Sequence, residues 1–297
     1  MKKIRNILFT ILMFLIVYII YDNIDTITTS VRDLLINNNK PSKVTKNDYT
    51  RSYNYINFNY NEEYTPYNKE DIINIYFNIL NNGEQEFNFN CPSEYKSCTE
   101  DIISIGKDNT LMSSINNYVH PFNSFESINT KVSSLGNVTV YINYKYNKEK
   151  IDKINNKIDL IIKSLELDKL TNREKLEKIH DYIIENTKYD NESDTSGYDS
   201  TSSYGTLIEG YAVCSGYSDT MAIFLDRFNI PNLKVSSKNH IWNLVYLNNK
   251  WLHLDLTWDD SDDDKYNDNY FLITKEKLFE LDSKEHMFDE SFFVEAR

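Results

Sequence analysis

The chain has 297 residues, enough for one large domain or two smaller ones with their own hydrophobic cores. Its composition is 40% hydrophobic and 26% charged, which is typical of a folded globular protein, and wholesale disorder is not expected. The 45 Asp and Glu residues outnumber the 32 Lys and Arg residues, which gives a formal net charge of −13. Because such a chain offers no basic surface to hold phosphates, we expect no nucleic acid partner.

Residues 1–21 have the pattern of an export signal. Lys2, Lys3 and Arg5 precede an apolar run over residues 7–21, in the order typical of a secretory signal. No Ala-x-Ala cleavage pattern follows, so we interpret the run as an uncleaved signal-anchor, a transmembrane helix, with a cleaved signal peptide as the alternative. Positive charge ahead of the span favours a cytoplasmic N-terminus. The sequence thus predicts a single-pass cell-membrane protein with an extracellular C-terminal domain or, with cleavage, a secreted one.

The next part of the chain is predicted to hold a linker and a small domain. Residues 22–48, rich in Asn, Thr, Ser and Lys, are interpreted as a linker. A helical stripe over 69–80, an alternating segment at 86–90 and another at 138–146 follow. We therefore expect residues 49–147 to form a small α+β domain, to which the sequence assigns no role.

The three cysteines divide into a pair and a single residue. Cys91 and Cys98 flank a short loop, and in an exported chain we expect them to form a disulfide. Two free thiols are the alternative, while zinc is not expected because no second Cys or His pair stands at zinc-like spacing. Cys214 remains as a lone thiol, either buried and inert or reactive.

Residues 148–297 begin with two predicted helices. The first covers 148–165 and has isoleucines at helical spacing. The second starts at Thr171, with Glu174 three residues later as in a capping box. We interpret His180 in this helix as a structural histidine.

Cys214 follows a glycine-rich segment. Gly205, Gly210 and Gly216 lie close to it, and glycine permits tight turns and close approach of the backbone. An apolar stripe over 217–228 predicts a helix that starts at or just after Cys214. A helix N-terminus favours a thiolate, although a cysteine merely packed there is an equal alternative.

A predicted hairpin resolves this alternative. Residues 240–247 and 250–257 flank Asn248-Asn249, a pair that tolerates the positive φ of a two-residue turn. With that turn, one face of the hairpin is apolar, and the other face is expected to carry His240, Trp242, Tyr246, Trp251, His253, Asp255 and Thr257.

This second face supplies partners for the thiol. His240 lies opposite Thr257 and diagonal to Asp255, within reach of a carboxylate–imidazole hydrogen bond. If the Cys214 helix covers this face, Cys214, His240 and Asp255 form the nucleophile, base and orienting group of covalent acyl transfer. His253 lies further along the hairpin and is left out. The three tryptophans, Trp242, Trp251 and Trp258, are either packing residues or walls of a substrate groove.

The acidic residues after the hairpin offer a weak calcium alternative. They are Asp259, Asp260, Asp262, Asp263, Asp264 and Asp268. Their spacing lacks the Gly and terminal Glu of an EF-hand loop, so we interpret them as a solvated run. We expect no metal and no cofactor.

The segments around Cys214, His240 and Asp255 resemble the transglutaminase-like superfamily. The resemblance rests on Gly-Tyr-Ala-Val-Cys-Ser-Gly-Tyr at 210–217, His-Ile-Trp-Asn at 240–243 and Trp-Leu-His-Leu-Asp-Leu-Thr-Trp-Asp at 251–259. It covers roughly residues 150–275, and the Asn-Thr-Lys-Tyr-Asp segment ending at Asp190 adds to it.

The resemblance implies an α+β fold with a papain-like transglutaminase core, in which the helix bearing the cysteine packs on an antiparallel sheet. It also implies Cys214 as nucleophile, His240 as general base and acid, and Asp255 as its orienting group. For the oxyanion, the Cys214 backbone N–H is the natural donor and Tyr204 a second candidate.

We therefore expect an extracellular, membrane-anchored cysteine enzyme that transfers acyl groups from peptide or side-chain amides. It would be a protease or amidase, or else a transglutaminase, with hydrolysis slightly favoured, and its partner would be a protein or peptide, including one of the cell envelope. The first rival is a non-catalytic cell-surface binding or scaffold module with this fold. The second is a cross-linked structural component of a coat or wall.

Overall fold

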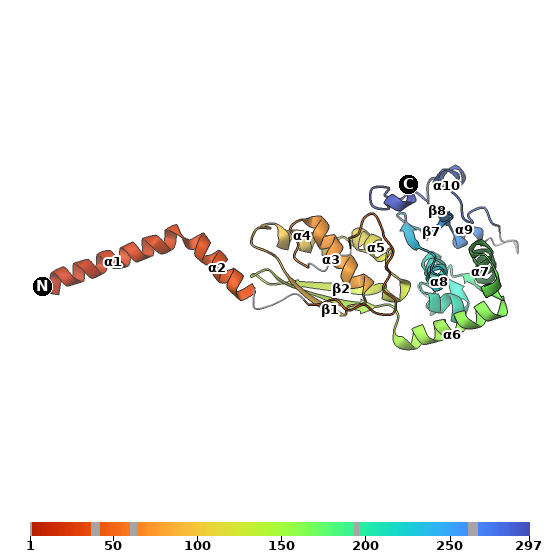
Figure 1. Cartoon of the computed structure of the whole chain (residues 1–297), viewed down its shortest axis with the longest axis horizontal. Helices are drawn as coiled ribbons and strands as arrows, with labels where there is room; N and C mark the ends of the chain where they lie inside the picture. Colours follow the sequence, from red (N-terminus) through yellow and green to blue (C-terminus); the bar gives the residue numbers. More distant parts are fainter. Residues whose placement is uncertain (1, 37–41, 60–63, 193–195, 261–266) are drawn as a thin grey trace.

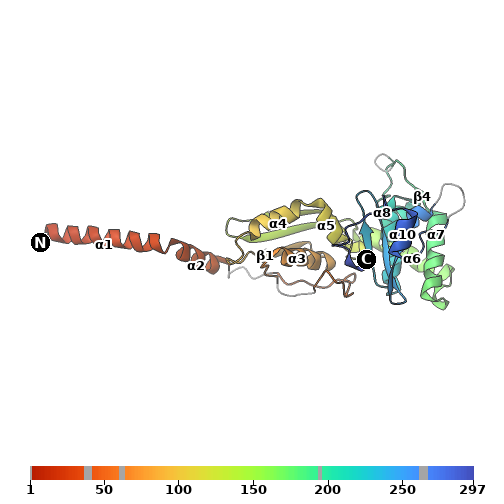
Figure 2. The same cartoon turned by 90° about the horizontal axis from the view of Figure 1, so that it is seen from above.

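The computed structural model of the chain describes residues 2–36, 42–59, 64–192, 196–260 and 267–297. Two N-terminal helices, α1 (Lys2–Asp22) and α2 (Ile24–Ile36), project away from the rest of the molecule in both views (Figures 1 and 2). Helix α2 occupies much of the segment that we interpreted as a linker. Its Ile24, Ile27 and Val31 recur at helical spacing, a signal hidden by the polar composition around them.

The membrane-spanning helix predicted at residues 1–21 is not supported. Helix α1 covers the predicted run, but among the described residues no helix is both long and apolar enough to cross a bilayer.

The next unit packs three helices on one face of an antiparallel sheet (Figure 1). Its sheet has the order β1-β3-β2, and its disulfide joins Cys91 to Cys98 with the Cα atoms 5.8 Å apart, as predicted. The elements of this unit are α3 (Lys69–Asn81), β1 (Glu86–Asn90), α4 (Cys98–Lys107), α5 (Asn109–Asn116), η1 (Pro121–Asn123), β2 (Phe125–Val132) and β3 (Asn137–Tyr144).

The C-terminal unit surrounds a second antiparallel sheet of order β6-β7-β8, and a short parallel pair joins β4 to β5. In chain order its elements are α6 (Lys148–Ser164), η2 (Leu167–Lys169), α7 (Asn172–Asn186), β4 (Lys188–Tyr189), η3 (Gly205–Glu209, a π-helical turn), β5 (Tyr211–Ala212), α8 (Cys214–Arg227), β6 (Asn232–Ser236), β7 (Ile241–Leu247), β8 (Lys250–Leu254), α9 (Leu256–Asp259), α10 (Lys275–Leu281) and η4 (Val294–Ala296).

The register of the β7–β8 hairpin is as predicted. Leu247 pairs with Lys250 across a two-residue turn, and Asn243 pairs with Leu254. Asn248 and Asn249 adopt φ values of 52° and 62°, the left-handed backbone that this turn requires. The capping box at the start of α7 is also present, with the Thr171 side chain accepting from the Glu174 N–H.

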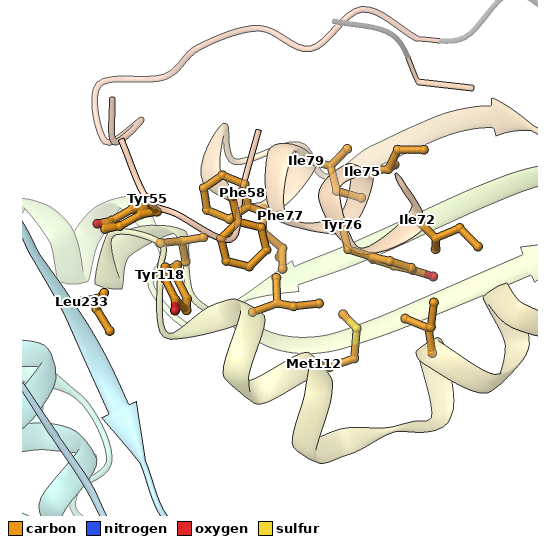
Figure 3. Packing of buried hydrophobic residues seen from close by; sticks show 14 of the residues in the cluster. Tyr55, Phe58, Ile72, Ile75, Tyr76, Phe77, Ile79, Met112, Tyr118 and Leu233 are labelled. Carbon is orange, nitrogen blue, oxygen red and sulfur yellow. The ribbon is translucent and has the colours of Figure 1, made fainter. Parts of the chain in front are cut away.

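Both faces of the β6-β7-β8 sheet are buried, which differs from the predicted division into an apolar face and a site face. Val245 and Leu254 pack with residues of α8 in one core cluster. On the other face, Leu233 and Trp242 belong to a second cluster that continues into the N-terminal unit. Figure 3 shows Leu233 of β6 close to aromatic rings of this second cluster. The two units therefore share a core across the predicted boundary between residues 147 and 148.

Buried charges hold α8 in this arrangement. Arg51 Nη2 lies 2.6 Å from Asp226 Oδ2 and 2.8 Å from Asn232 Oδ1. About two turns earlier in the helix, Asp219 accepts hydrogen bonds from Lys234 of β6 and, at 2.9 Å, from Tyr146. These side chains are almost completely buried, so each carboxylate in the helix depends on its cationic partner.

Candidate active site

Cys214 is the first residue of α8. The preceding Val213 has extended backbone (φ −103°, ψ 178°), and the half-buried thiol carries no disulfide. The N–H of the first helical residue has no intrahelical acceptor, so the positive end of the helix dipole lies beside the sulfur. Two glycines make this placement possible. Gly210 adopts φ +78°, and a Cβ on Gly216 would lie 2.4 Å from Ser200 O.

His240 lies immediately before β7. Its backbone N–H donates to Ser237 Oγ (3.2 Å), and its ring stacks on Trp242 at 5.7 Å between centroids. Helix α8 covers the opposite sheet face from the one expected, because the Asn243 side chain donates to Ser218 O and Val245 packs into the α8 cluster. Because His240 precedes the strand, the alternation of side chains between the two sheet faces does not determine the direction in which its side chain points.

Asp255 follows the last residue of β8 and caps α9. Its Oδ1 accepts from the backbone N–H groups of Thr257 (3.0 Å) and Trp258 (3.3 Å), as expected for an N-cap aspartate. The cap leaves Oδ2 free to accept from His240 Nε2 at 2.5 Å. Thr257, which was predicted to lie opposite His240 in a longer strand, is instead part of α9.

Electrostatics connect these groups to the thiol. Burial alone would lower the pKa of His240, but the Asp255 carboxylate and a hydrogen bond with Cys214 raise it to about 10. Burial alone would likewise raise the pKa of Asp255, and the neighbouring His240 and His286 lower it to about 2. The structure thus brings Cys214, His240 and Asp255 together, with an ionised carboxylate behind an imidazole that holds its proton.

His286 is a component of the site that sequence reasoning missed. Its Nε2 lies 2.9 Å from Asp255 Oδ2, and its side chain is completely buried. It lies in an irregular segment after α10, 31 residues from Asp255, with no motif or periodicity around it. No signal in the sequence could have placed it here.

The other histidines singled out in the sequence have structural contacts. His180 of α7 lies between Asp181 and Asp259, at 3.1 Å and 3.2 Å, and is buried as expected. His253 Nδ1 accepts from Trp242 Nε1 at 2.9 Å, and burial lowers the pKa of this histidine to about 3. Neither ring has a recorded contact with Cys214 among the described residues.

Aromatic side chains surround the site unequally. The Trp258 ring lies 6.2 Å from His240, whereas Trp251 packs on Tyr246 further along the hairpin. Tyr204, considered above as an oxyanion donor, instead lies beside Lys150 and Lys153 of α6. Tyr189 of β4 is nearer to the nucleophile.

The evidence for Tyr189 is electrostatic. Burial and the nearby charges of Cys214 and Asp255 raise the pKa of its phenol. The ring is 41% exposed, so this hydroxyl combines proximity to the thiol with access to solvent.

Three residues of the site combine an acid–base arrangement with atoms that could ligate a metal. His240, Asp255 and His286 place potential ligand atoms within 4.8 Å of one another. The closest of these atoms, however, already pair as N–H donors and carboxylate acceptor at hydrogen-bond distances. The calcium alternative rested largely on Asp262, Asp263 and Asp264, which lie outside the described residues.

Residues 161–256, which contain Cys214, His240 and Asp255, match the model of the transglutaminase-like superfamily. This part of the chain is a transglutaminase-like domain. No curated protein shows significant similarity to the chain.

Two solved structures show weak similarity to this chain. One is a crystal structure of a TGase, 19% identical over 50% of this chain and 49% of that chain, with a TM-score of 0.35. The other is a candidate cysteine protease from Cytophaga hutchinsonii, 16% identical over 44% and 61% of the two chains, with a TM-score of 0.28. The chain thus spans about half the length of the first structure, and only the family match and the site geometry bear on function below.

Proposed function

We propose that this chain is a cysteine enzyme that transfers acyl groups from peptide or side-chain amides, with Cys214, His240 and Asp255 as its catalytic triad. One observation carries this proposal. The Cys214 thiol, at the start of α8, is hydrogen-bonded to His240, and His240 is hydrogen-bonded in turn to the ionised Asp255. A purely structural cysteine requires neither the imidazole nor the carboxylate behind it.

The reaction follows from the positions of these groups. Cys214 Sγ, as a thiolate, attacks the carbonyl carbon of the amide and forms a tetrahedral oxyanion. The C–N bond breaks, the His240 imidazolium gives its proton to the departing nitrogen, and an amine or ammonia leaves a thioester on Cys214. Water or a second amine then attacks the thioester, His240 takes up a proton from it, the C–S bond breaks, and the Cys214 thiolate and the His240 imidazolium are regenerated. Asp255 orients the imidazole and stabilises its charged form.

The oxyanion needs donors beside the sulfur. The Cys214 N–H at the first helical position has no intrahelical acceptor and suits this role. The Tyr189 hydroxyl is a second donor that fits its proximity to Cys214. In a Tyr189→Phe variant, acylation should slow while alkylation of the resting thiol is retained.

The test of this function is alkylation of Cys214 in the full-length protein with limiting iodoacetamide near pH 6, followed by peptide mapping. Fast labelling of Cys214 that collapses in His240→Ala would support the thiolate–imidazolium pair. His180→Ala serves as a matched control, because it removes a buried histidine from a neighbouring helix. Equal, slow labelling of the wild type and His240→Ala would contradict the proposal and favour a binding module.

We propose hydrolysis as the principal outcome, because water competes with every amine at a site open to solvent. A fluorescent primary amine supplied with a glutamine-rich protein distinguishes the two outcomes. Release of acid or ammonia without incorporation of the amine is expected, whereas efficient incorporation would instead favour cross-linking.

We also propose that the enzyme works outside the cytoplasm. The Cys91–Cys98 disulfide is typical of an oxidising compartment, and basic residues precede the apolar part of α1. Trapping the free thiols with a mass tag at the moment of lysis tests this location. An oxidised pair is expected, and a reduced pair would contradict the proposal.

A further inference from the structure

The segment after α10 connects the triad to a second carboxylate. His286 donates from Nε2 to Asp255 Oδ2, the same oxygen that accepts from His240, and its Nδ1 lies 3.1 Å from Asp282 Oδ2. His286 is completely buried, whereas the Asp282 side chain is 18% exposed. A series of hydrogen bonds therefore extends from His240 through Asp255 and His286 to a carboxylate near the surface.

The two carboxylates determine the protonation of His286. A neutral imidazole has one donor and one acceptor nitrogen, and only an imidazolium donates from both. Burial opposes ionisation of Asp255 and Asp282, yet hydrogen bonds that include those from His286 lower the pKa of both carboxyls. Because two ionised carboxylates only accept, the hydrogen-bond geometry calls for an N–H on each nitrogen of His286.

The surroundings hold this ring in one orientation. Asp282 is itself fixed, because it accepts from the backbone N–H groups of Lys284 (3.3 Å) and Glu285 (2.9 Å). Aromatic rings enclose the imidazole with centroid distances of 4.9 to 5.3 Å, and they belong to Trp242, Trp258 and Tyr270.

The titratable groups that face His286 are few. Apart from Asp255 and Asp282, they are His240 at 5.4 Å between ring centroids, Tyr270 stacked at 5.3 Å, and His253 of β8. Burial keeps His253 neutral with a pKa of about 3, and burial with nearby carboxylates raises the pKa of Tyr270 to about 12. His240 and His286 are therefore the two imidazoles that share Asp255 Oδ2.

We propose that His286 is a positioning residue of the active site, a charged imidazolium that occupies Asp255 Oδ2 alongside His240 and partly neutralises the carboxylate on which His240 depends. This inference rests on the proposed function, since it concerns the same site. By sharing the negative charge of Asp255, His286 weakens the electrostatic stabilisation that this carboxylate gives to protonated His240. That proton can then be given to the departing nitrogen more readily.

The first experiment observes the cation directly. Long-range 15N–1H spectra of the full-length protein labelled at histidine should show several imidazolium signals at pH 7.5, one of which disappears in His286→Gln. In Asp282→Asn the same signal should become that of a neutral ring, because Nδ1 loses its carboxylate partner. A neutral His286 in the wild type would overturn the inference whatever the reactivity of Cys214.

The second experiment measures the effect on the triad. In wild type, the rate of Cys214 alkylation plotted against pH should show a low-pH inflection for thiolate formation and a high-pH inflection for loss of the His240 proton. In His286→Gln, which keeps an N–H donor but no charge, the upper inflection should rise by roughly one pH unit. Asp282→Asn should produce a smaller shift in the same direction and serves as the test if His286→Gln fails to fold.

The matched control is His180→Gln, which removes another buried histidine held between two carboxylates, Asp181 and Asp259. It should lower the melting temperature without moving the upper inflection. Fast low-pH labelling in wild type with an unmoved inflection in His286→Gln and Asp282→Asn would overturn the role of His286 and leave the proposed function intact. Slow labelling in wild type at every pH would instead contradict the proposed function, while the 15N spectra still decide the state of His286.

Discussion

Helix α8 has two regions with ionisable side chains, one at its first residue and one further along, and the two differ in their exposure to solvent. At its first residue, Cys214 contacts His240, which is paired with Asp255, and the thiol is half-exposed. Further along, Asp226 is paired with Arg51 and Asp219 with Lys234, and no more than 10% of any of these side chains is exposed. Under the proposed function, an acid beside a base supplies reactivity in the first region and holds the helix in place in the second, and the two regions differ in their access to solvent.

The strongest test of this division is Cys214→Ala. Removal of the nucleophile should reduce turnover on the order of 10⁶-fold, because the triad acts as a unit. The free energy of unfolding, measured by denaturant titration, should stay nearly unchanged, since the thiol is half-exposed. Substantial unfolding of this variant would mean that the first region also holds the fold.

Asp255→Asn should have a smaller effect on rate. The amide can keep the N-cap geometry but cannot stabilise the His240 imidazolium, so turnover should fall about 10²- to 10⁴-fold. Steady-state kinetics on any amide substrate found in a screen would measure it. A rate close to that of wild type would show that Asp255 is not the orienting group.

Arg51→Met tests the second region. Loss of the guanidinium leaves Asp226 buried without its closest cationic partner, and the free energy of unfolding should fall by about 3–5 kcal/mol. The rate of Cys214 alkylation in the folded protein should not change. Arg227→Met is the control, because its partner Asp159 is 56% exposed and the loss should stay under about 1 kcal/mol.

The pH dependence of stability separates the regions in another way. The pKa of His240 is raised from 6.5 to about 10, so protonation of His240 stabilises the folded chain. This contribution is fully present below pH 6.5 and is lost as the pH rises through about 10. Unfolding titrations of wild type and His240→Ala across this range should converge at high pH. A constant difference between them would contradict the assignment.

The smallest expected effect lies outside both regions. Thr171→Ala removes the side chain that caps α7 and should lower the free energy of unfolding by about 1 kcal/mol. Thr171→Ser, which keeps the hydroxyl, is the control. A change in the Cys214 alkylation rate in Thr171→Ala would show that α7 is coupled to the site.

Much of the fold followed from short-range patterns. The stripes at 69–80 and 148–165 became α3 and α6, and strand β1 has its predicted bounds. The elements α4, α5 and β2 were not predicted, since the two helices are short and β2 is half-exposed along its length. Helix α2 was not predicted either, because the polar residues around Ile24, Ile27 and Val31 hid their helical spacing.

The sequence by itself determined the helix that begins at Cys214, the two-residue turn at Asn248-Asn249 and the register that brings Asp255 near His240. Each depends on periodicity or turn chemistry within a few residues. Tertiary structure alone decided which face of the β6-β7-β8 sheet α8 covers, because both faces are apolar and two cores compete for them. It also decided that His286 joins Asp255, since a contact across 31 residues depends on the packing of the whole C-terminal segment against the sheet.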